Sequence, residues 1–284
     1  MNRLALAVVA LSAFVAGPAF AADMPLKAPP APVAPPPLWQ GFYVGLNAGY
    51  SWGNSSTSYT GTGTGFVPFT TSQKMDGGLG GGQIGYNWIT GKFPYCPTCS
   101  NWVFGIEADI QGTGQSGTAP FPGVTVTTTN PLAILSTTVT STGSLKQSLP
   151  WFGTVRARLG VNPTPTWLLY VTGGLAYGEI DSTASFTTTV STPAGTASAS
   201  ASSSSNVTRA GWTIGGGVEG VITGAWTAKL EYLYMDFGTF NNTFVGPPVG
   251  AYTTLAASSR VTDNIVRVGV DYHFNWGGPI ATRY

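Results

Sequence analysis

Residues 263–276 read DNIVRVGVDYHFNW, and the alternation of their side chains identifies the kind of strand they form. Successive side chains of an extended strand point to opposite faces. One face is apolar and aromatic, whereas the other carries full charges beside a glycine: Val266, Val268, Val270, Tyr272 and Phe274 lie on the first, and Ile265, Arg267, Gly269, Asp271 and His273 on the second. This pattern predicts a barrel strand with lipid outside and a polar interior.

Seven further segments follow the same rule, and each is long enough to cross a bilayer at a tilt. They are residues 40–52, 80–88, 102–111, 151–161, 167–177, 209–222 and 226–234. We therefore predict an all-β fold, an eight-stranded antiparallel up-and-down transmembrane β-barrel. All nine tryptophans lie at or near a predicted strand end, which is the pattern of two aromatic girdles at the membrane surfaces.

The connections between these segments alternate in length. Four are long (53–78, 112–148, 178–208 and 235–262), and three are short (90–101, 162–166 and 223–225). Long outer loops and short periplasmic turns are typical of outer-membrane barrels, and an even number of strands places both termini in the periplasm. Within the third long connection, residues 182–206 are rich in Ser, Thr and Ala, so they either are disordered or extend the hairpin above the membrane.

The amino terminus predicts export. A basic residue, Arg3, precedes the apolar run 4–16, and small residues Ala19 and Ala21 flank a cleavage position, so residues 1–21 are predicted to be a signal peptide. Residues 22–38 form a proline-rich periplasmic spacer or a peptidoglycan tether. The barrel domain is expected over residues 39–276, and residues 277–284 are a C-terminal extension.

Ten charged residues are predicted to face the interior of the barrel. They are Glu107, Asp109, Arg156, Arg158, Arg209, Glu219, Lys229, Glu231, Arg267 and Asp271. Counting from the short turns places Glu107 level with Arg156, Glu219 with Lys229, and Glu231 with Arg267. Because unpaired buried charges are costly, we predict a ladder of lumen ion pairs that plugs the barrel.

The sequence offers little support for catalysis or cofactor binding. Two glycine patterns, beginning at Gly80 and Gly215, do not open a helix and so cannot form a dinucleotide site. Cys96 and Cys99 are expected to form a local disulfide rather than remain free, and two cysteines with one histidine, His273, are too few for a zinc site. His273 is expected to be a structural residue bonded to Asp271. We predict no catalytic residue, metal or cofactor.

Three phrases carry a family resemblance: WQGFYVGLNAGY at 39–50, GGQIGYNW at 81–88 and KLEYLY at 229–234. They resemble the small porin-family outer-membrane proteins of alphaproteobacteria, called outer-membrane immunogenic proteins, which are similar to the OmpA-type eight-stranded barrel. The resemblance implies an assembly signal at Arg267, Gly269, Tyr272 and Phe274. That signal commonly ends the chain, but here residues 275–284 follow it, so either Phe274 or Tyr284 is the aromatic that is read.

These observations predict a non-enzymatic integral protein of the outer membrane that serves envelope structure and surface display. The alternative is a narrow porin-like channel for ions or small solutes. Expected partners are the outer-membrane lipid and, during insertion, the barrel-assembly machinery; host or phage ligands at the outer loops are further candidates. Nucleic acid is excluded because acidic and basic residues nearly balance, with 12 Lys and Arg against 11 Asp and Glu.

Overall fold

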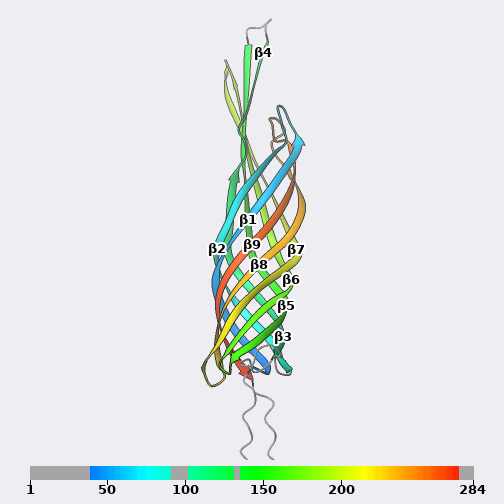
Figure 1. The fold of residues 1–284 in the computed structure, drawn as a ribbon. Coiled ribbons are helices and arrows are strands. Elements are labelled where there is room, and N and C mark those ends of the chain that lie inside the picture. The colour runs from blue at the N-terminus through cyan, green and yellow to red at the C-terminus, as the bar shows by residue number, and fades with distance from the viewer. Residues whose placement is uncertain (1–38, 91–101, 131–134, 275–284) are drawn as a thin grey trace, which may run out of the picture. The chain divides into compact units, whose positions relative to one another are not determined.

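The computed structural model describes residues 39–90, 102–130 and 135–274. This part of the chain forms nine β-strands, and none of its segments is a helix long and apolar enough to cross a membrane. The strands are β1 (Gly41–Thr62), β2 (Phe69–Thr90), β3 (Trp102–Pro120), β4 (Val124–Asn130), β5 (Leu135–Thr164), β6 (Trp167–Thr192), β7 (Gly195–Thr223), β8 (Trp226–Val245) and β9 (Thr254–Phe274) (Figure 1).

Eight of the nine strands close a ring. Each pairs antiparallel with its neighbours in the order β1, β2, β3, β5, β6, β7, β8, β9, and β9 returns to β1 from Phe42↔Phe274 to Thr62↔Thr254. The remaining strand, β4, pairs only with β5 among the described residues, and it lies beyond the outer end of β3 (Figure 1). The predicted eight-stranded up-and-down barrel is confirmed.

The two faces of the strands are as predicted. On β1, Leu46 is 73% exposed, whereas Tyr43, three residues earlier, is fully buried in the lumen. The same contrast holds around the ring, because an alternating strand can satisfy lipid on one side and a polar interior on the other only in one register. Exposed apolar side chains include Ile84, Ile106, Val155, Val171, Ile214, Leu230 and Val268.

Tryptophan marks the two ends of the lipid-facing band. Trp52 and Trp212 are about half exposed at the outer end, and Trp226 packs edge-on against Tyr272 at the periplasmic end, with ring centroids 5.1 Å apart. Trp39 departs from the predicted girdle. Its ring is buried, and its indole Nε1 donates a 3.0 Å hydrogen bond to the carbonyl of Pro165, so it closes the periplasmic mouth of the lumen.

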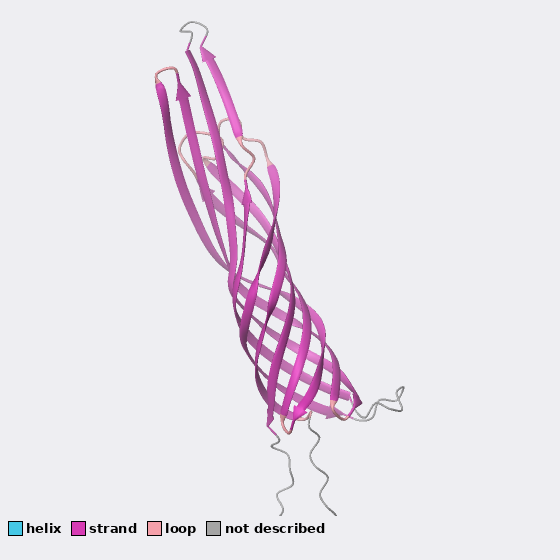
Figure 2. Cartoon of the chain, turned by 90° about the vertical axis from the view of Figure 1, so that its left-hand side faces the viewer, coloured by secondary structure: helices cyan, strands magenta, loops and turns pink. Residues whose placement is uncertain are grey.

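The long outer connections are largely continuations of the strands. β5, β6 and β7 contain 30, 26 and 29 residues, far more than a bilayer crossing needs. The segment 182–206 extends the β6–β7 hairpin to a turn between Thr192 and Gly195, which is the second of its two predicted alternatives (Figure 2). Paired strands satisfy the backbone polar groups above the membrane, so this arrangement is preferred to an open loop.

Side chains fill the inside of the ring in layers. Above the charged residues lies an inner apolar layer, which we define as Met75, Leu79, Leu149, Phe152, Ala176, Ile180, Leu233, Met235, Phe237, Phe240, Val261 and Ile265. Nearer the outer end lies a second apolar core, built around Tyr59, Phe121, Phe186, Phe244 and Tyr252. The predicted signal peptide, the spacer, Cys96, Cys99 and the C-terminal extension lie outside the described residues.

Candidate functional site: the charged lumen

The three predicted level pairs are direct partners in the strand register. Glu107 of β3 faces Arg156 of β5, Glu219 of β7 faces Lys229 of β8, and Glu231 of β8 faces Arg267 of β9. All six side chains are essentially buried inside the ring. Counting residues from the short periplasmic turns was sufficient to place them, because the counts start at the same end of the barrel and side chains at similar counts lie at similar heights.

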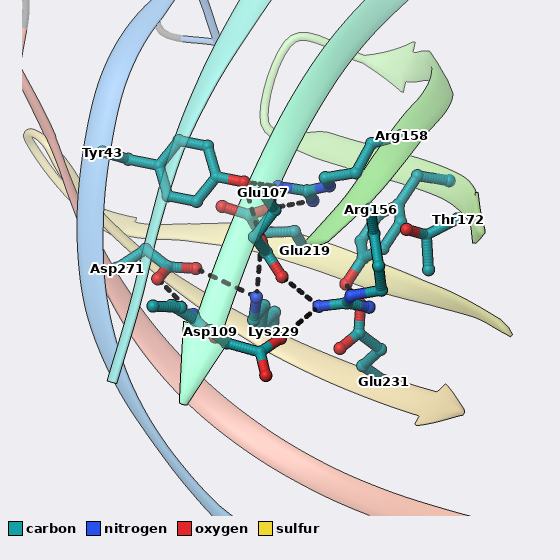
Figure 3. A network of polar contacts seen from close by, with 12 residues as sticks. Tyr43, Glu107, Asp109, Arg156, Arg158, Thr172, Glu219, Lys229, Glu231 and Asp271 are labelled. Carbon is teal, nitrogen blue, oxygen red and sulfur yellow. Dashed lines mark hydrogen bonds and ion pairs between the residues drawn. The ribbon is translucent and has the colours of Figure 1, made fainter. Parts of the chain in front are cut away.

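Glu107 is the centre of the network (Figure 3). Its carboxylate lies within ion-pair distance of four cations supplied by β5, β8 and β9. Arg156 Nη2 donates to Oε1, Lys229 Nζ lies 2.9 Å from Oε2, and Arg158 and Arg267 lie at 3.4 and 3.5 Å. Hydrogen bonds between charged groups are roughly twice as strong as those between neutral groups.

A second group of contacts surrounds Glu231. Arg267 Nη2 lies 2.6 Å from Glu231 Oε2, and Arg156 Nη1 donates to Glu231 Oε1 at 2.9 Å. The same two arginines reach Asp109 Oδ2 at 3.0 and 2.9 Å. Each arginine therefore bridges at least two carboxylates, as its forked guanidinium allows.

Glu219 and Lys229 are neighbours in register but form no ion pair with each other in the described structure. Glu219 instead binds Arg158 Nη2 at 2.8 Å and lies 3.0 Å from His273 Nε2. Lys229 extends across the lumen to Glu107 and lies 3.9 Å from Asp271. Long side chains that point into a narrow ring can reach the opposite wall, so the predicted ladder is in fact a cross-linked cluster.

Arg209 does not belong to this cluster. It lies at the outer side of the inner apolar layer, where its guanidinium carbon is 5.5 Å from the centroid of the Phe240 ring, and it makes no ion pair within the described residues. The other nine predicted residues make up what we call the charged cluster: Glu107, Asp109, Arg156, Arg158, Glu219, Lys229, Glu231, Arg267 and Asp271. Five carboxylates therefore face four cations, and His273 lies beside one of the carboxylates, Glu219.

His273 is a buried, hydrogen-bonded residue as predicted, but its partner differs. It contacts Glu219 and lies 3.3 Å from Thr227 Oγ1, whereas Asp271 accepts a hydrogen bond from Gln83 Nε2. The two residues share a face of β9, but Asp271 turns toward β2 and His273 toward β7. Same-face spacing placed both side chains in the lumen without fixing which neighbour each would meet.

Two tyrosines, which the charge pattern alone did not indicate, also contact the charged cluster. Tyr43 donates a 2.7 Å hydrogen bond to Glu107 Oε2 and accepts one of 2.7 Å from Arg158 Nη1. Tyr170 donates to Glu231 at 3.0 Å, and the Arg158 guanidinium lies 3.9 Å from the centroid of its ring. Both tyrosines are buried on the inward face of their strands, and a buried phenol needs a hydrogen-bond partner.

Asp263 lies outside the charged cluster, one residue beyond the level of Trp52 at the outer end of the lipid-facing band. Its Oδ1 accepts a 2.9 Å hydrogen bond from Gln115 Nε2, and its neighbours in the lumen are residues of the inner apolar layer such as Met235 and Ile265. Burial raises the pKa of Asp263 to about 7. Among the described residues, no cation offsets the desolvation of this carboxyl.

Two further features of the lumen concern metal and dinucleotide binding. The described residues contain no group of three or more His, Cys, Asp and Glu side chains arranged to hold a metal ion. The two glycine patterns are extended strand, one in the middle of β2 and the other near the periplasmic end of β7. At Gly85, an added Cβ would lie 2.3 Å from the Tyr43 ring, so this glycine makes room for an inward side chain.

Comparison with known proteins identifies the family. The model of the outer membrane protein beta-barrel domain matches residues 6–274. The chain is 32% identical over 288 residues to the 31 kDa outer-membrane immunogenic protein of Brucella melitensis, covering 94% of this chain and 98% of that protein. It is 28% identical over 210 residues to the 22 kDa outer membrane protein of Rhizobium leguminosarum, covering 73% and 68%.

Among solved structures, the outer membrane protein OprG from Pseudomonas aeruginosa aligns over 83% of this chain and 97% of its own, with 12% identity and a TM-score of 0.42. The family assignment rests on the family model and the sequence relatives. The chain therefore belongs to the outer membrane protein beta-barrel domain family and is an integral protein of the bacterial outer membrane.

Proposed function

We propose that this protein is a non-enzymatic structural component of the outer membrane that displays its long outer hairpins at the cell surface. The observation that carries the proposal is the filling of the lumen. The charged cluster joins opposite walls of the ring, and the inner apolar layer lies directly above it.

Opening the lumen by breaking the charged cluster would cost considerable free energy. An eight-stranded barrel is only wide enough for side chains to fill its interior. Removing one partner of a buried ion pair typically costs about 3–5 kcal/mol, because the other charge is left without compensation. Arg156 alone contacts three carboxylates, so spontaneous opening of the cluster should be rare.

A narrow channel is the second candidate, and one observation favours it. The side-chain amides of Asn87 and Gln111 are buried in the lumen without a hydrogen-bond partner in the protein. Groups of this kind normally bind water, which would hydrate the part of the lumen around them. A continuous path would still have to pass Leu149 and Phe152 of the inner apolar layer.

Single-channel recording distinguishes the two candidates. The mature protein, refolded and inserted into planar bilayers, is expected to be silent or to show only rare, small events. Steady openings of the size seen for porins would contradict the structural role and support the channel.

The display role has its own test. Replacing residues 189–198, the outermost part of the β6–β7 hairpin, with a two-residue Asn-Gly turn should leave the ring and both apolar cores intact. This part lies beyond Phe186, and its strands pair only with each other and with β5. Loss of binding to host or phage material by this variant, with normal membrane insertion, would identify the hairpin as the binding element. Unchanged binding would exclude it.

A further inference from the structure

The outer part of β7 has a free edge. β6 pairs with one edge of β7 along its whole length, from Trp167↔Gly220 to Thr192↔Gly195. In the described structure β8 pairs with the other edge only from Trp212 to Thr223. The residues from Gly195 to Ser200 are all exposed, and the hairpin projects beyond the ring (Figure 2). We call residues 183–204 of β6 and β7 the finger.

This edge lacks the features that usually keep strand edges apart. Proteins protect exposed edges with charged residues, prolines or bulges. Residues 196–202 read TASASAS, with no charge and no proline, and the β6–β7 register is continuous through them. An unpaired edge of this kind is a template for another extended strand.

The edge sequence is complementary to itself. It is nearly palindromic about Ala199, so an antiparallel pair of copies places hydroxyl residues opposite hydroxyl residues and alanines opposite alanines. Within one chain the same face already forms hydroxyl pairs between β6 and β7, with Thr187 3.1 Å from Ser200 and Thr189 3.0 Å from Ser198. A second copy would continue this array without a size or charge mismatch.

Membrane geometry determines where the second copy can be. Copies in one membrane point the same way, so their β7 strands run parallel and cannot form this pairing. Two copies whose fingers meet from facing membranes run antiparallel. Ala199 lies 13 residues beyond the girdle residue Trp212, roughly 40 Å along the strand at about 3.3 Å per residue, so the finger can reach past the lipid surface.

We propose that the free edge of β7 pairs with the same edge of a second copy in a facing membrane and thereby joins membrane to membrane. The inference rests on the outward display of the finger proposed above. Seven residues a side fall well short of the 20–30 residues of a stable interface, so a single pair should be weak. Many copies on two surfaces supply the strength through multivalency.

Clustering of proteoliposomes tests the pairing. Wild-type vesicles, reconstituted from detergent, should cluster with one another, as measured by light scattering, and not with protein-free vesicles. Ala199→Lys and Ala199→Glu vesicles should each fall to the level of protein-free vesicles, because like charges then face each other across the symmetry axis. Mixing the two variants at low salt should restore clustering, and high salt should abolish the restored clustering.

Ser58→Lys adds the same charge to the exposed face of β1, away from the finger, and should cluster like the wild type. Heat-modifiable migration on gels checks that every variant is folded. Three outcomes would each overturn the pairing. They are clustering of Ala199→Lys vesicles at the wild-type level, failure of the mixed variants to recover clustering, and clustering of wild-type vesicles with protein-free vesicles.

Labelling of Ala199→Cys on intact cells with a bulky, membrane-impermeant maleimide tests display separately. If the finger is labelled but wild-type vesicles do not cluster, the pairing is contradicted and the display role is retained. A finger that is not labelled contradicts the display role itself.

Discussion

Lys229 of β8 and Glu107 of β3 lie on opposite walls of the barrel, four strands apart in either direction around the ring, and their side chains meet at 2.9 Å. The contact is possible because both side chains point into a lumen that is only as wide as two extended side chains. It ties together strands that share no backbone hydrogen bond. The charged cluster therefore cross-links opposite walls of the ring, an arrangement that we call the cross-braced lumen.

Arg156→Ala should lower the free energy of unfolding by about 3–5 kcal/mol, because it leaves Glu107, Asp109 and Glu231 short of a shared cation. Urea titration of the folded protein in detergent micelles measures the change. Arg260→Ala is the control. The Arg260 side chain is 61% exposed, and its buried partner Asp236 keeps a hydrogen bond from the Gly238 N–H, so the loss should be smaller. Equal effects of the two substitutions would show that the cluster is not a major source of stability.

Conductance should be blocked by two barriers in series, the inner apolar layer and the charged cluster. Phe152→Ala opens space in the inner apolar layer but leaves the charged cluster in place, so this variant should remain silent in planar bilayers. Arg156→Ala combined with Phe152→Ala should conduct measurably. Conductance by the Phe152→Ala variant alone would show that the cluster does not close the lumen.

Asp263 predicts a specific pH dependence. Its raised pKa, about 7, means that the folded state binds more protons than the unfolded state between about pH 4 and pH 7, so stability should fall as the pH rises through that window. At about 1.4 kcal/mol per pKa unit, the loss is at most about 4 kcal/mol. Asp263→Asn should remove this fall, which urea titrations at pH 4.5 and pH 7.5 would detect. An unchanged difference between the two pH values would contradict the assignment.

The closing strand is expected to carry the assembly signal within the chain. Tyr272 and Phe274 pack edge-on with ring centroids 5.0 Å apart at the periplasmic end of β9. Tyr272→Ala and Phe274→Ala should lower the amount of heat-modifiable protein in the outer membrane more than deletion of residues 275–284 does. The reverse order would show that Tyr284 is the residue read.

The sequence predicted the ring and the level of its charges because both follow from period-two alternation and short turns. Alternation alone indicates that Glu219 and Lys229 face inward, and the turn at Gly224 sets their register. It cannot indicate that Lys229 reaches across to Glu107, because that depends on the diameter of the lumen and on how eight strands are staggered.

Two other differences between the predicted and the observed side-chain positions also arise from contacts between distant parts of the chain. Trp39 follows the strand-end rule, yet its ring turns inward to bond Pro165, a contact between residues 126 positions apart. Arg209 satisfies the inward rule but lies beyond the inner apolar layer, beside Phe240. The strand character of the outer connections was hidden because Ser- and Thr-rich sequence is common to loops and to exposed hairpins.

A double-mutant cycle on Glu107 and Lys229 tests the closed, cross-braced lumen most directly. The free energy of unfolding would be measured for the wild type, Glu107→Gln, Lys229→Met and the double variant. We predict that each single change is strongly destabilising and that the double variant is more stable than the sum of the two, with a coupling of about 1–3 kcal/mol. Additive effects, with no coupling between the two walls, would contradict the account.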